Sequence, residues 1–172
     1  MTHVRKRRSM AKGFLGGMIA GLGASWTMNQ FWAVKAKLQQ QNQPADEHNQ
    51  EQQREADNPT VKVAQAIARP LLGRELTTDE KPSAGSVVHY AFGALMGGLF
   101  GLICEAMPAA HAGFGTLYAT ALWLGANEAM VPALKLSKPP REYPLEQHLS
   151  GLGAHLVYGV TAEAARRGLR AA

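Results

Sequence analysis

Histidine and glutamate residues occur inside the most hydrophobic stretches of this sequence, where ionisable groups are rare. His89, Glu128 and His155 each lie several residues inside such a stretch, and Asn127 adjoins the glutamate. Two histidines and a carboxylate brought together bind a divalent metal, two histidines ligate haem, and intramembrane His and Glu relay protons. The remaining role is to hydrogen-bond between helices. We expect that structural role, with no metal or cofactor, and keep proton transfer as the alternative.

A second set of polar residues occurs near the other ends of the same stretches. It comprises Glu105, His111, Glu163 and Arg167. Glu163 and Arg167 are four positions apart with the acid first, which is the order that favours an ion pair on a helix. Arg166 is an alternative partner. We expect these side chains to form a polar layer at the end of the protein opposite to the first set.

The sequence contains none of the short motifs of common enzyme classes. G-x-S-x-G, H-E-x-x-H, C-x-x-C and the phosphate-binding loop are all absent. The single cysteine, Cys104, excludes an internal disulfide and is expected to be a small packing residue. We therefore expect a protein that is not an enzyme.

Four hydrophobic stretches must position these polar residues. They cover residues 13–34, 84–107, 112–134 and 148–165, each close to the ~20 residues that a helix needs to cross a bilayer. Residues 108–111, Pro-Ala-Ala-His, form a tight turn between the second and the third. The predicted fold is all-α, an integral membrane bundle of four transmembrane helices. At ~1.5 Å per residue, the first polar set lies roughly 8–10 Å below one end of its helices.

Small residues recur at every fourth position of these stretches. Residues four apart share a helix face, and small ones let helix backbones approach closely in lipid. The rows are Gly13, Gly17, Gly21, Ser25 and Asn29; His89, Gly93, Gly97, Gly101 and Glu105; Gly151, His155, Gly159, Glu163 and Arg167; and, more weakly, Ala121, Gly125, Ala129 and Ala133. Because the polar residues lie on or beside these rows, we predict that the rows are the helix contacts and that the polar side chains face away from lipid.

Basic residues are concentrated at the two ends of the chain, which carries a net charge of +5. They are Arg5, Lys6, Arg7, Arg8 and Lys12 at the start, and Arg166, Arg167 and Arg170 near the end. Basic ends beside apolar stretches are typical of cytoplasmic membrane boundaries. We expect a multi-pass protein with both termini in the cytoplasm and no nucleic-acid partner. A cleaved signal peptide is disfavoured because the first apolar stretch continues past Gly23-Ala24-Ser25 to Trp32.

Residues 35–82 differ from the rest of the chain. Their first part is rich in glutamine and charge and is expected to be disordered. A short helix is predicted from Pro59, with Asn58 as its cap, either on the outer membrane surface or packed on the ends of the spanning helices. Its apolar side comprises Val61, Ala64, Ile67, Ala68, Leu71 and Leu72. The predicted regions are residues 1–34, the basic N-terminus and first transmembrane helix; 35–82, the polar outer loop; and 83–172, the other three helices with the basic C-terminus.

Three segments of the chain resemble the YagU-like bacterial inner-membrane proteins. They are "VVHYAFGALMGGLFGLICEAMP", "ANEAMVPALKLSKPP" and "EQHLSGLGAHLVYGVTAEAARRGLR". The resemblance covers roughly residues 84–170, with His89, Glu105, Pro108, His155 and Glu163 at matching positions. It implies a bacterial inner-membrane location and a link to acid tolerance, without a known molecular activity. The glutamine-rich segment is a departure from that pattern.

These observations lead to two functional expectations. The first is a non-catalytic integral inner-membrane protein that supports acid or envelope stress tolerance. The alternative is a small channel or transporter that moves protons or ions through a bundle lined by histidine and glutamate. The lipid bilayer is the expected partner in both cases, and a second copy of the chain or a larger membrane complex is a further candidate partner.

Overall fold

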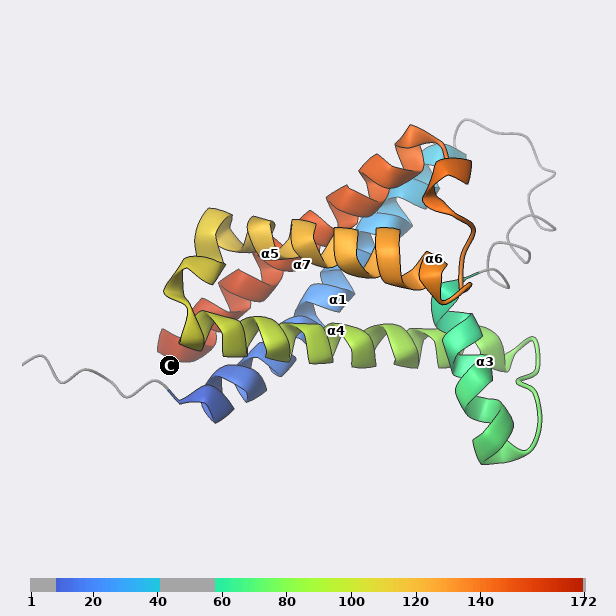
Figure 1. The fold of residues 1–172 in the computed structure, drawn as a ribbon, viewed down its shortest axis with the longest axis horizontal. Helices are drawn as coiled ribbons and strands as arrows, with labels where there is room; N and C mark the ends of the chain where they lie inside the picture. The colour runs from blue at the N-terminus through green and yellow to red at the C-terminus, as the bar shows by residue number, and fades with distance from the viewer. Residues whose placement is uncertain (1–8, 41–57, 172) are drawn as a thin grey trace, which may run out of the picture.

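The computed structural model of the chain describes residues 9–40 and 58–171, and every regular element in them is helical. The fold is therefore all-α, as the sequence predicts. The basic residues 5–8 and the segment 41–57, which was expected to be disordered, lie outside the described residues. Four long passes run along the molecule (Figure 1). They are α1 (Met10–Gln40), α4 (Glu80–Ala106), a third pass composed of α5 (Thr116–Leu122), η2 (Trp123–Met130) and α6 (Val131–Ala133), and α7 (Leu145–Ala171).

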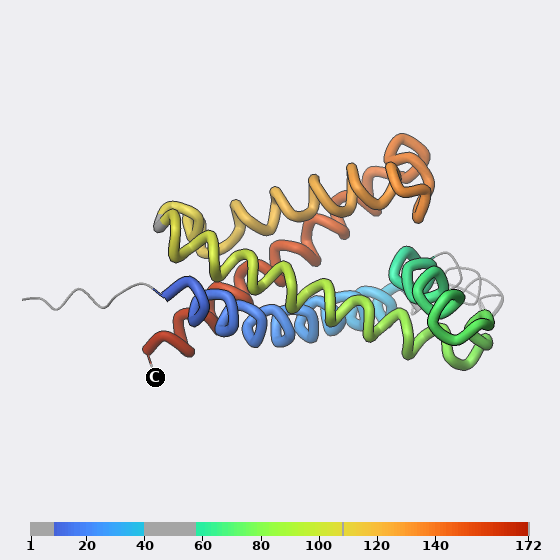
Figure 2. The backbone as a smooth tube through the Cα atoms, turned by 60° about the horizontal axis from the view of Figure 1, so that its bottom comes forward, coloured from blue at the N-terminus to red at the C-terminus, as the bar shows by residue number. Residues whose placement is uncertain are grey.

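Successive passes run in opposite directions, as Figures 1 and 2 both show. The start of α1, the end of α7 and the 3-10 segment η1 (Pro108–Gly115) lie at one end, called here the C-terminal end. The helix α3 (Pro59–Leu72) and the segment η3 (Pro140–Glu142) lie at the opposite end, called here the α3 end. The two ends of the described chain are therefore on the same side of the bundle.

The helices α1 and α4 touch through their backbones. A Cβ atom built on Gly17 would lie 2.2 Å from the Gly97 carbonyl oxygen, and one built on Gly21 would lie 2.3 Å from the Gly93 carbonyl oxygen. Cβ atoms in proteins essentially never approach another heavy atom within 3.0 Å. Only glycine permits this separation of the two helices, because it has no Cβ.

The third pass begins later than the sequence predicts. The turn expected at residues 108–111 continues to Gly115, and the α-helix begins at Thr116 instead of Ala112. Gly113, Phe114 and Gly115 have φ angles of 62°, 55° and 84°. This left-handed backbone cannot continue a right-handed helix. Further along, Trp123–Met130 is π-helical, so the pass contains no uninterrupted α-helix of spanning length.

Among the described helices, α4 alone is both long and apolar enough to cross a membrane by composition. Its most apolar 18-residue window has a mean hydropathy of 1.8. Glycine, tryptophan and amides lower the hydropathy of α1, the third pass is divided, and α7 contains histidine, glutamate and arginine. Composition thus supports one spanning helix, and the predicted four remain a proposal.

The apolar core lies where α1, α4, the third pass and α7 meet. Its buried members are Ala24, Met28, Phe100, Cys104, Ala154, Tyr158 and Ala162. The Tyr158 hydroxyl donates to the Gly93 carbonyl oxygen at 2.6 Å, and the Tyr118 hydroxyl donates to the Met96 carbonyl oxygen at 2.7 Å. Phe100 stacks on Tyr118 with ring centroids 4.6 Å apart. Both phenols therefore fill the core and still satisfy their polar ends.

The helix α3 begins at Pro59, the residue at which the sequence predicts a helix to start. Its cap is also the predicted one, because the Asn58 side-chain oxygen accepts a hydrogen bond from the Thr60 N–H at 3.0 Å. Three residues of its apolar side, Val61, Ala64 and Ala68, are buried. Val61 lies against Gly85 of α4. The prediction that α3 packs on the end of a neighbouring helix is therefore confirmed for its first half.

Candidate functional site

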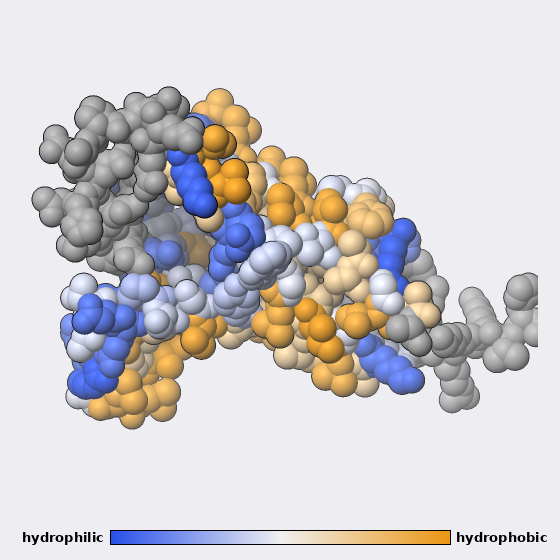
Figure 3. All heavy atoms as spheres, turned by 180° about the vertical axis from the view of Figure 1, so that it is seen from behind, coloured by the Kyte–Doolittle hydropathy of each residue, from blue (hydrophilic) through white to orange (hydrophobic). Residues whose placement is uncertain are grey.

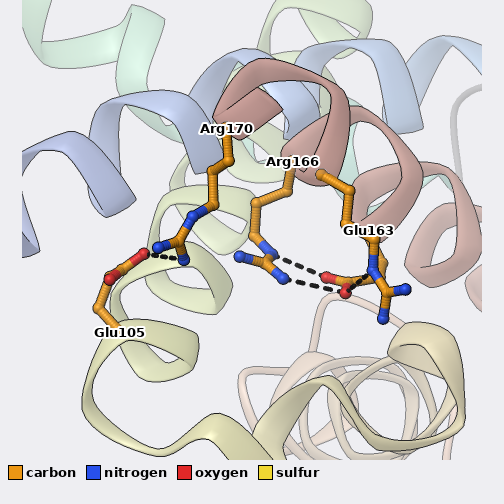
Figure 4. A network of polar contacts seen from close by, with 5 residues as sticks. Glu105, Glu163, Arg166 and Arg170 are labelled. Carbon is orange, nitrogen blue, oxygen red and sulfur yellow. Dashed lines mark hydrogen bonds and ion pairs between the residues drawn. The ribbon is translucent and has the colours of Figure 1, made fainter. Parts of the chain in front are cut away.

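Five charged side chains meet at the C-terminal end of the bundle, where α4 and α7 end close together (Figure 4). One comes from the last turn of α4 and four come from α7, where residues three and four apart share one side of the helix. We call this group the arginine cluster; its members are Glu105, Glu163, Arg166, Arg167 and Arg170.

Glu163 is the centre of the arginine cluster. Its side chain has an exposed fraction of 0 %, and both of its oxygens accept hydrogen bonds from arginine. The Arg166 guanidinium donates through Nε to Oε2 at 2.7 Å and through Nη2 to Oε1 at 2.9 Å, while Arg167 Nε donates to Oε1 at 2.6 Å. The two-pronged contact from Arg166 matches the planar fork of a guanidinium to a carboxylate. The predicted Glu163–Arg167 ion pair is present, and Arg166 shares it.

The arginine cluster joins four segments of the chain. The Arg170 guanidinium is ion-paired with Glu105, which links α7 to α4. The Arg167 guanidinium lies 4.6 Å from the centroid of the Phe114 ring, in η1, an arrangement that attracts the cation to the ring face. A Cβ atom on Gly13 of α1 would lie 2.4 Å from Glu105 Cγ. Removing one member therefore disturbs the contact of several helices.

The chemistry of the arginine cluster is that of a fixed ion-pair network. Three guanidinium groups face two carboxylates, which leaves one positive charge in excess. Arginine does not lose its proton in proteins, so none of the three relays protons. Breaking a buried ion pair strands a charge away from water and costs several kcal/mol. His111, which the sequence placed in this layer, lies in η1 and takes no part in these ion pairs.

A second ion pair lies at the α3 end of the bundle. Glu128, in the π-helical η2, faces His148, in the first turns of α7, with 2.9 Å between Oε2 and Nδ1. The other ring nitrogen, Nε2, lies 3.0 Å from the Pro140 carbonyl oxygen. Acceptors face both ring nitrogens, and this arrangement favours the doubly protonated imidazolium. Tyr143 contributes a further contact at the edge of the ring.

The sequence predicted a different partner for Glu128. With a helix predicted to begin at residue 148, His155 and Glu128 were expected at the same distance from the ends of their helices. The helix α7 begins earlier, at Leu145. His155 is therefore ~15 Å along the helix, whereas His148 is only ~4.5 Å along it. Glu128 lies ~7.5 Å before the end of α6 at Ala133, so His148 is the nearer match. The signal that was missed is the start of the helix directly after Pro144.

The other predicted members of this layer lie nearby without joining the ion pair. His155 Nδ1–H donates to the Gly151 carbonyl oxygen at 2.8 Å, one turn back in its own helix. His155 is within electrostatic range of both His89 and Glu128. His89 Nε2 is buried and has no hydrogen-bond partner among the described residues. The Asn127 amide donates to Glu128 Oε1 at 3.3 Å from an exposed position.

The small-residue rows differ in what they face. A Cβ atom on Gly101 would lie 2.0 Å from the Gly13 carbonyl oxygen, and one on Gly159 would lie 2.5 Å from the Gly115 carbonyl oxygen. At Gly151 it would meet Trp123 Nε1 at 3.2 Å, so α7 lies against the π-helical segment there. The weaker row on the third pass is exposed, and a Cβ atom on Gly125 would meet nothing within 4 Å. Within the part of the chain that the structure describes, that row is therefore not a contact between helices.

No metal site is evident in residues 9–40 and 58–171, where no three His, Cys, Asp or Glu side chains come together in a suitable group. His148 has both ring nitrogens engaged by a carboxylate and a carbonyl, which leaves no lone pair directed at a shared ion. The arginine cluster repels cations because of its excess positive charge.

Comparison with known proteins gives a family and no activity. Residues 47–164 match the family described as "Protein of unknown function (DUF1440)". No curated protein and no solved structure matches the chain.

Proposed function

The chain belongs to the DUF1440 family of proteins of unknown function, and we propose that it is a non-catalytic integral membrane protein whose four passes cross a bilayer. The distribution of polarity carries this proposal. Glu163, Arg166 and Glu105 are buried, whereas large apolar side chains are exposed on every pass. Those side chains include Leu15, Ile19 and Leu22 on α1, Leu95 and Leu99 on α4, Leu117 and Leu124 on the third pass, and Leu149 and Val160 on α7.

Lipid is the medium that suits such a surface. Soluble monomers rarely expose large contiguous apolar surfaces, and ionisable groups within a bilayer face protein. On the face shown in Figure 3, hydrophobic residues lie above and below a paler band that crosses the middle, and strongly hydrophilic residues lie toward both ends and at one place near the middle. Backbone contact at glycine is a common way for helices to associate where lipid supplies no hydrophobic driving force.

The proposed location is the bacterial inner membrane, with both termini in the cytoplasm. Four alternating passes return the chain to the side on which it began. Arg166, Arg167 and Arg170 of α7 lie at that end, as does Lys12 of α1. In the sequence, Arg5, Lys6, Arg7 and Arg8 precede α1. Basic residues next to spanning helices are retained on the cytoplasmic side. The α3 end then faces the periplasm.

The proposed role is support of acid or envelope stress tolerance, and the His148–Glu128 pair is the observation that favours it. The pair lies at the α3 end, where the apolar part of α7 begins, which would bring it close to periplasmic pH. Falling pH protonates the imidazole of His148, whose two ring nitrogens face the Glu128 carboxylate and the Pro140 carbonyl oxygen. The ion pair then ties the third pass to α7 more strongly, which would stiffen the bundle in acid.

A path for protons or ions is the alternative function. It is favoured by His89 and His155, which are close enough to interact electrostatically, and by the buried His89 Nε2, which has no hydrogen-bond partner among the described residues. The arginine cluster argues against it, because a proton arriving from the α3 end would meet three permanently charged guanidinium groups at the other end.

Fractionation of cells that express the full chain tests the membrane proposal. We expect the protein in the inner-membrane fraction, resistant to extraction by alkaline carbonate. Recovery in the soluble fraction would overturn the proposal.

Survival after acid exposure tests the role in a strain that lacks the gene. The parent gene and His111→Gln should restore survival, while His148→Gln should not, with equal protein levels. Equal rescue by His148→Gln would show that the His148–Glu128 pair does not support acid tolerance. Proton flux into vesicles that is abolished by His89→Gln would instead establish the alternative.

A further inference from the structure

Residues 9–40 and 58–171 cover only part of the apolar side of α3. Near its start, Val61 packs so closely on α4 that a Cβ atom on Gly85 would lie 2.8 Å from Val61 Cγ2. Ala64 and Ala68 are buried on the same side. The first half of α3 therefore has its partner within the chain.

The same side continues past α4, and none of the described residues buries it there. Ile67 follows Ala64 by three positions, and Leu71 and Leu72 follow Ala68 by three and four, so they extend the buried side along the helix. Their exposed fractions are 49 %, 76 % and 57 %. We call Ile67, Leu71 and Leu72 the α3 tip. The tip is continuous with a contact that α3 already makes to α4.

The orientation of α3 sets it apart from the four passes. It lies across the bundle, and its far end projects beyond α4 (Figure 1). In Figure 3 this projection shows hydrophobic residues at its end and on the side toward the middle of the bundle, and hydrophilic residues on the side turned away. A helix that lies in the plane of a membrane surface presents its sides in this way.

The connection after α3 holds the tip in place. Gly73 takes a left-handed conformation with φ 66°, and its N–H donates to the Arg69 carbonyl oxygen. The Arg74 guanidinium donates twice to Glu80, at 2.7 Å each. Gln65 of α3 accepts from the Leu76 N–H at 3.1 Å. The segment 73–79 therefore fixes α3 against the start of α4.

We propose that the α3 tip is embedded in the interfacial layer of the lipid bilayer and acts as an anchor that sets the depth of α4. This inference rests on the proposed function, because it needs the four passes to cross that bilayer. The α3 tip contacts the hydrocarbon boundary and not charged headgroups, because the nearby arginines are already ion-paired within the chain. Arg69 pairs with Glu75, and Arg74 pairs with Glu80. An anionic headgroup is not required, and zwitterionic vesicles suffice.

The test places a nitroxide label at single cysteines in the full chain, in a Cys104→Ala background, reconstituted in phosphatidylcholine vesicles. The positions are Leu71 at the tip, Ala66 on the opposite side of α3, about 140° around the helix, and Leu95 on the exposed side of α4. All three side chains are exposed, so the labels do not disturb packing. Collisions with oxygen report lipid, and collisions with a water-soluble nickel complex report solvent.

We expect the ratio of oxygen to nickel accessibility to be several-fold higher at Leu71 than at Ala66, and high at Leu95. A low ratio at Leu71 with a high one at Leu95 would overturn the anchor and leave the membrane proposal intact. Shielding of Leu71 from both reagents would also overturn it, because protein, such as a second copy, would then cover the tip. A low ratio at Leu95 would overturn the membrane proposal itself.

Discussion

Two adjacent glycines in α1 should respond in opposite ways to the same substitution. In Gly17→Ala the new Cβ atom would lie 2.2 Å from the Gly97 carbonyl oxygen, 3.0 Å from its carbonyl carbon and 3.1 Å from Gly101 Cα. All three are backbone atoms, so no side chain can turn away. Ordinary contact begins at 3.4 Å, so α1 and α4 must part by about 1.2 Å at this point. Gly16 has nothing within 4 Å and is the matched control.

The size of the effect follows from two opposing contributions. Forcing extra atoms into a packed contact costs ~1–3 kcal/mol, and a gap of 0.5–1 Å forfeits about a quarter to a half of the dispersion energy across it. The better helix propensity of alanine returns ~1 kcal/mol. Because the contact is made of backbone alone, Gly17→Ala should be less stable than the parent by about 1–2 kcal/mol. Gly16→Ala should gain ~0.5–1 kcal/mol.

Unfolding of the purified protein measures both effects. Each variant, solubilised in a mild detergent, is titrated with sodium dodecyl sulfate while its circular dichroism is followed. The midpoint should fall for Gly17→Ala and stay level or rise for Gly16→Ala. Equal midpoints for the two variants would refute the close contact of α1 and α4 at Gly17.

The remaining predictions concern charged groups and use the same unfolding assay. Glu163→Gln should lower the free energy of unfolding by ~3 kcal/mol or more because Arg166 stays buried without its charged partner. Arg167→Gln, at a half-exposed position, should lower it by less than ~1 kcal/mol. Similar losses for the two variants would contradict the buried network. Glu128 and the Pro140 carbonyl both accept from the ring of His148, so the protonated ring should stabilise the bundle in acid, and this stabilisation should be lost as pH rises. His148→Gln should abolish that pH dependence, and an unchanged profile would count against the pair. The pKa of Glu80 is lowered to about 2 by Arg74, so its stabilisation is present above 4.5 and is lost as pH falls toward about 2; Glu80→Gln should remove that loss.

The contact between α1 and α4 could be predicted from the spacing of glycines. Gly17 and Gly21 on α1, and Gly93 and Gly97 on α4, lie where rows of every fourth residue would bring two helices together. Backbone contact needs only small residues at the right period, and both are visible in a sequence. The row through Gly125 shows the limit of this reasoning, because the same pattern there faces outward.

The third pass and its polar partner were harder to predict. Nothing in the sequence marks Phe114 as left-handed, a conformation that non-glycine residues adopt rarely. The π-helical turn around Glu128 likewise has no sequence signature. These two features and the start of α7 at Leu145 decide which histidine meets Glu128. Pairings between helices depend on helix ends, which sequence patterns locate only to within a few residues.

The alternating passage of the four helices through the membrane is the central claim, and reactivity of single cysteines tests it most directly. Single cysteines replace Met10, Ala109 and Gly168 at the C-terminal end, and Glu75 and Lys138 at the α3 end, in a Cys104→Ala background; all five positions are exposed. An impermeant thiol reagent is applied to intact spheroplasts and to lysed ones. The account predicts that the cysteines at positions 75 and 138 react in intact spheroplasts and that those at positions 10, 109 and 168 react only after lysis. Any one position that reacts on the other side would contradict it.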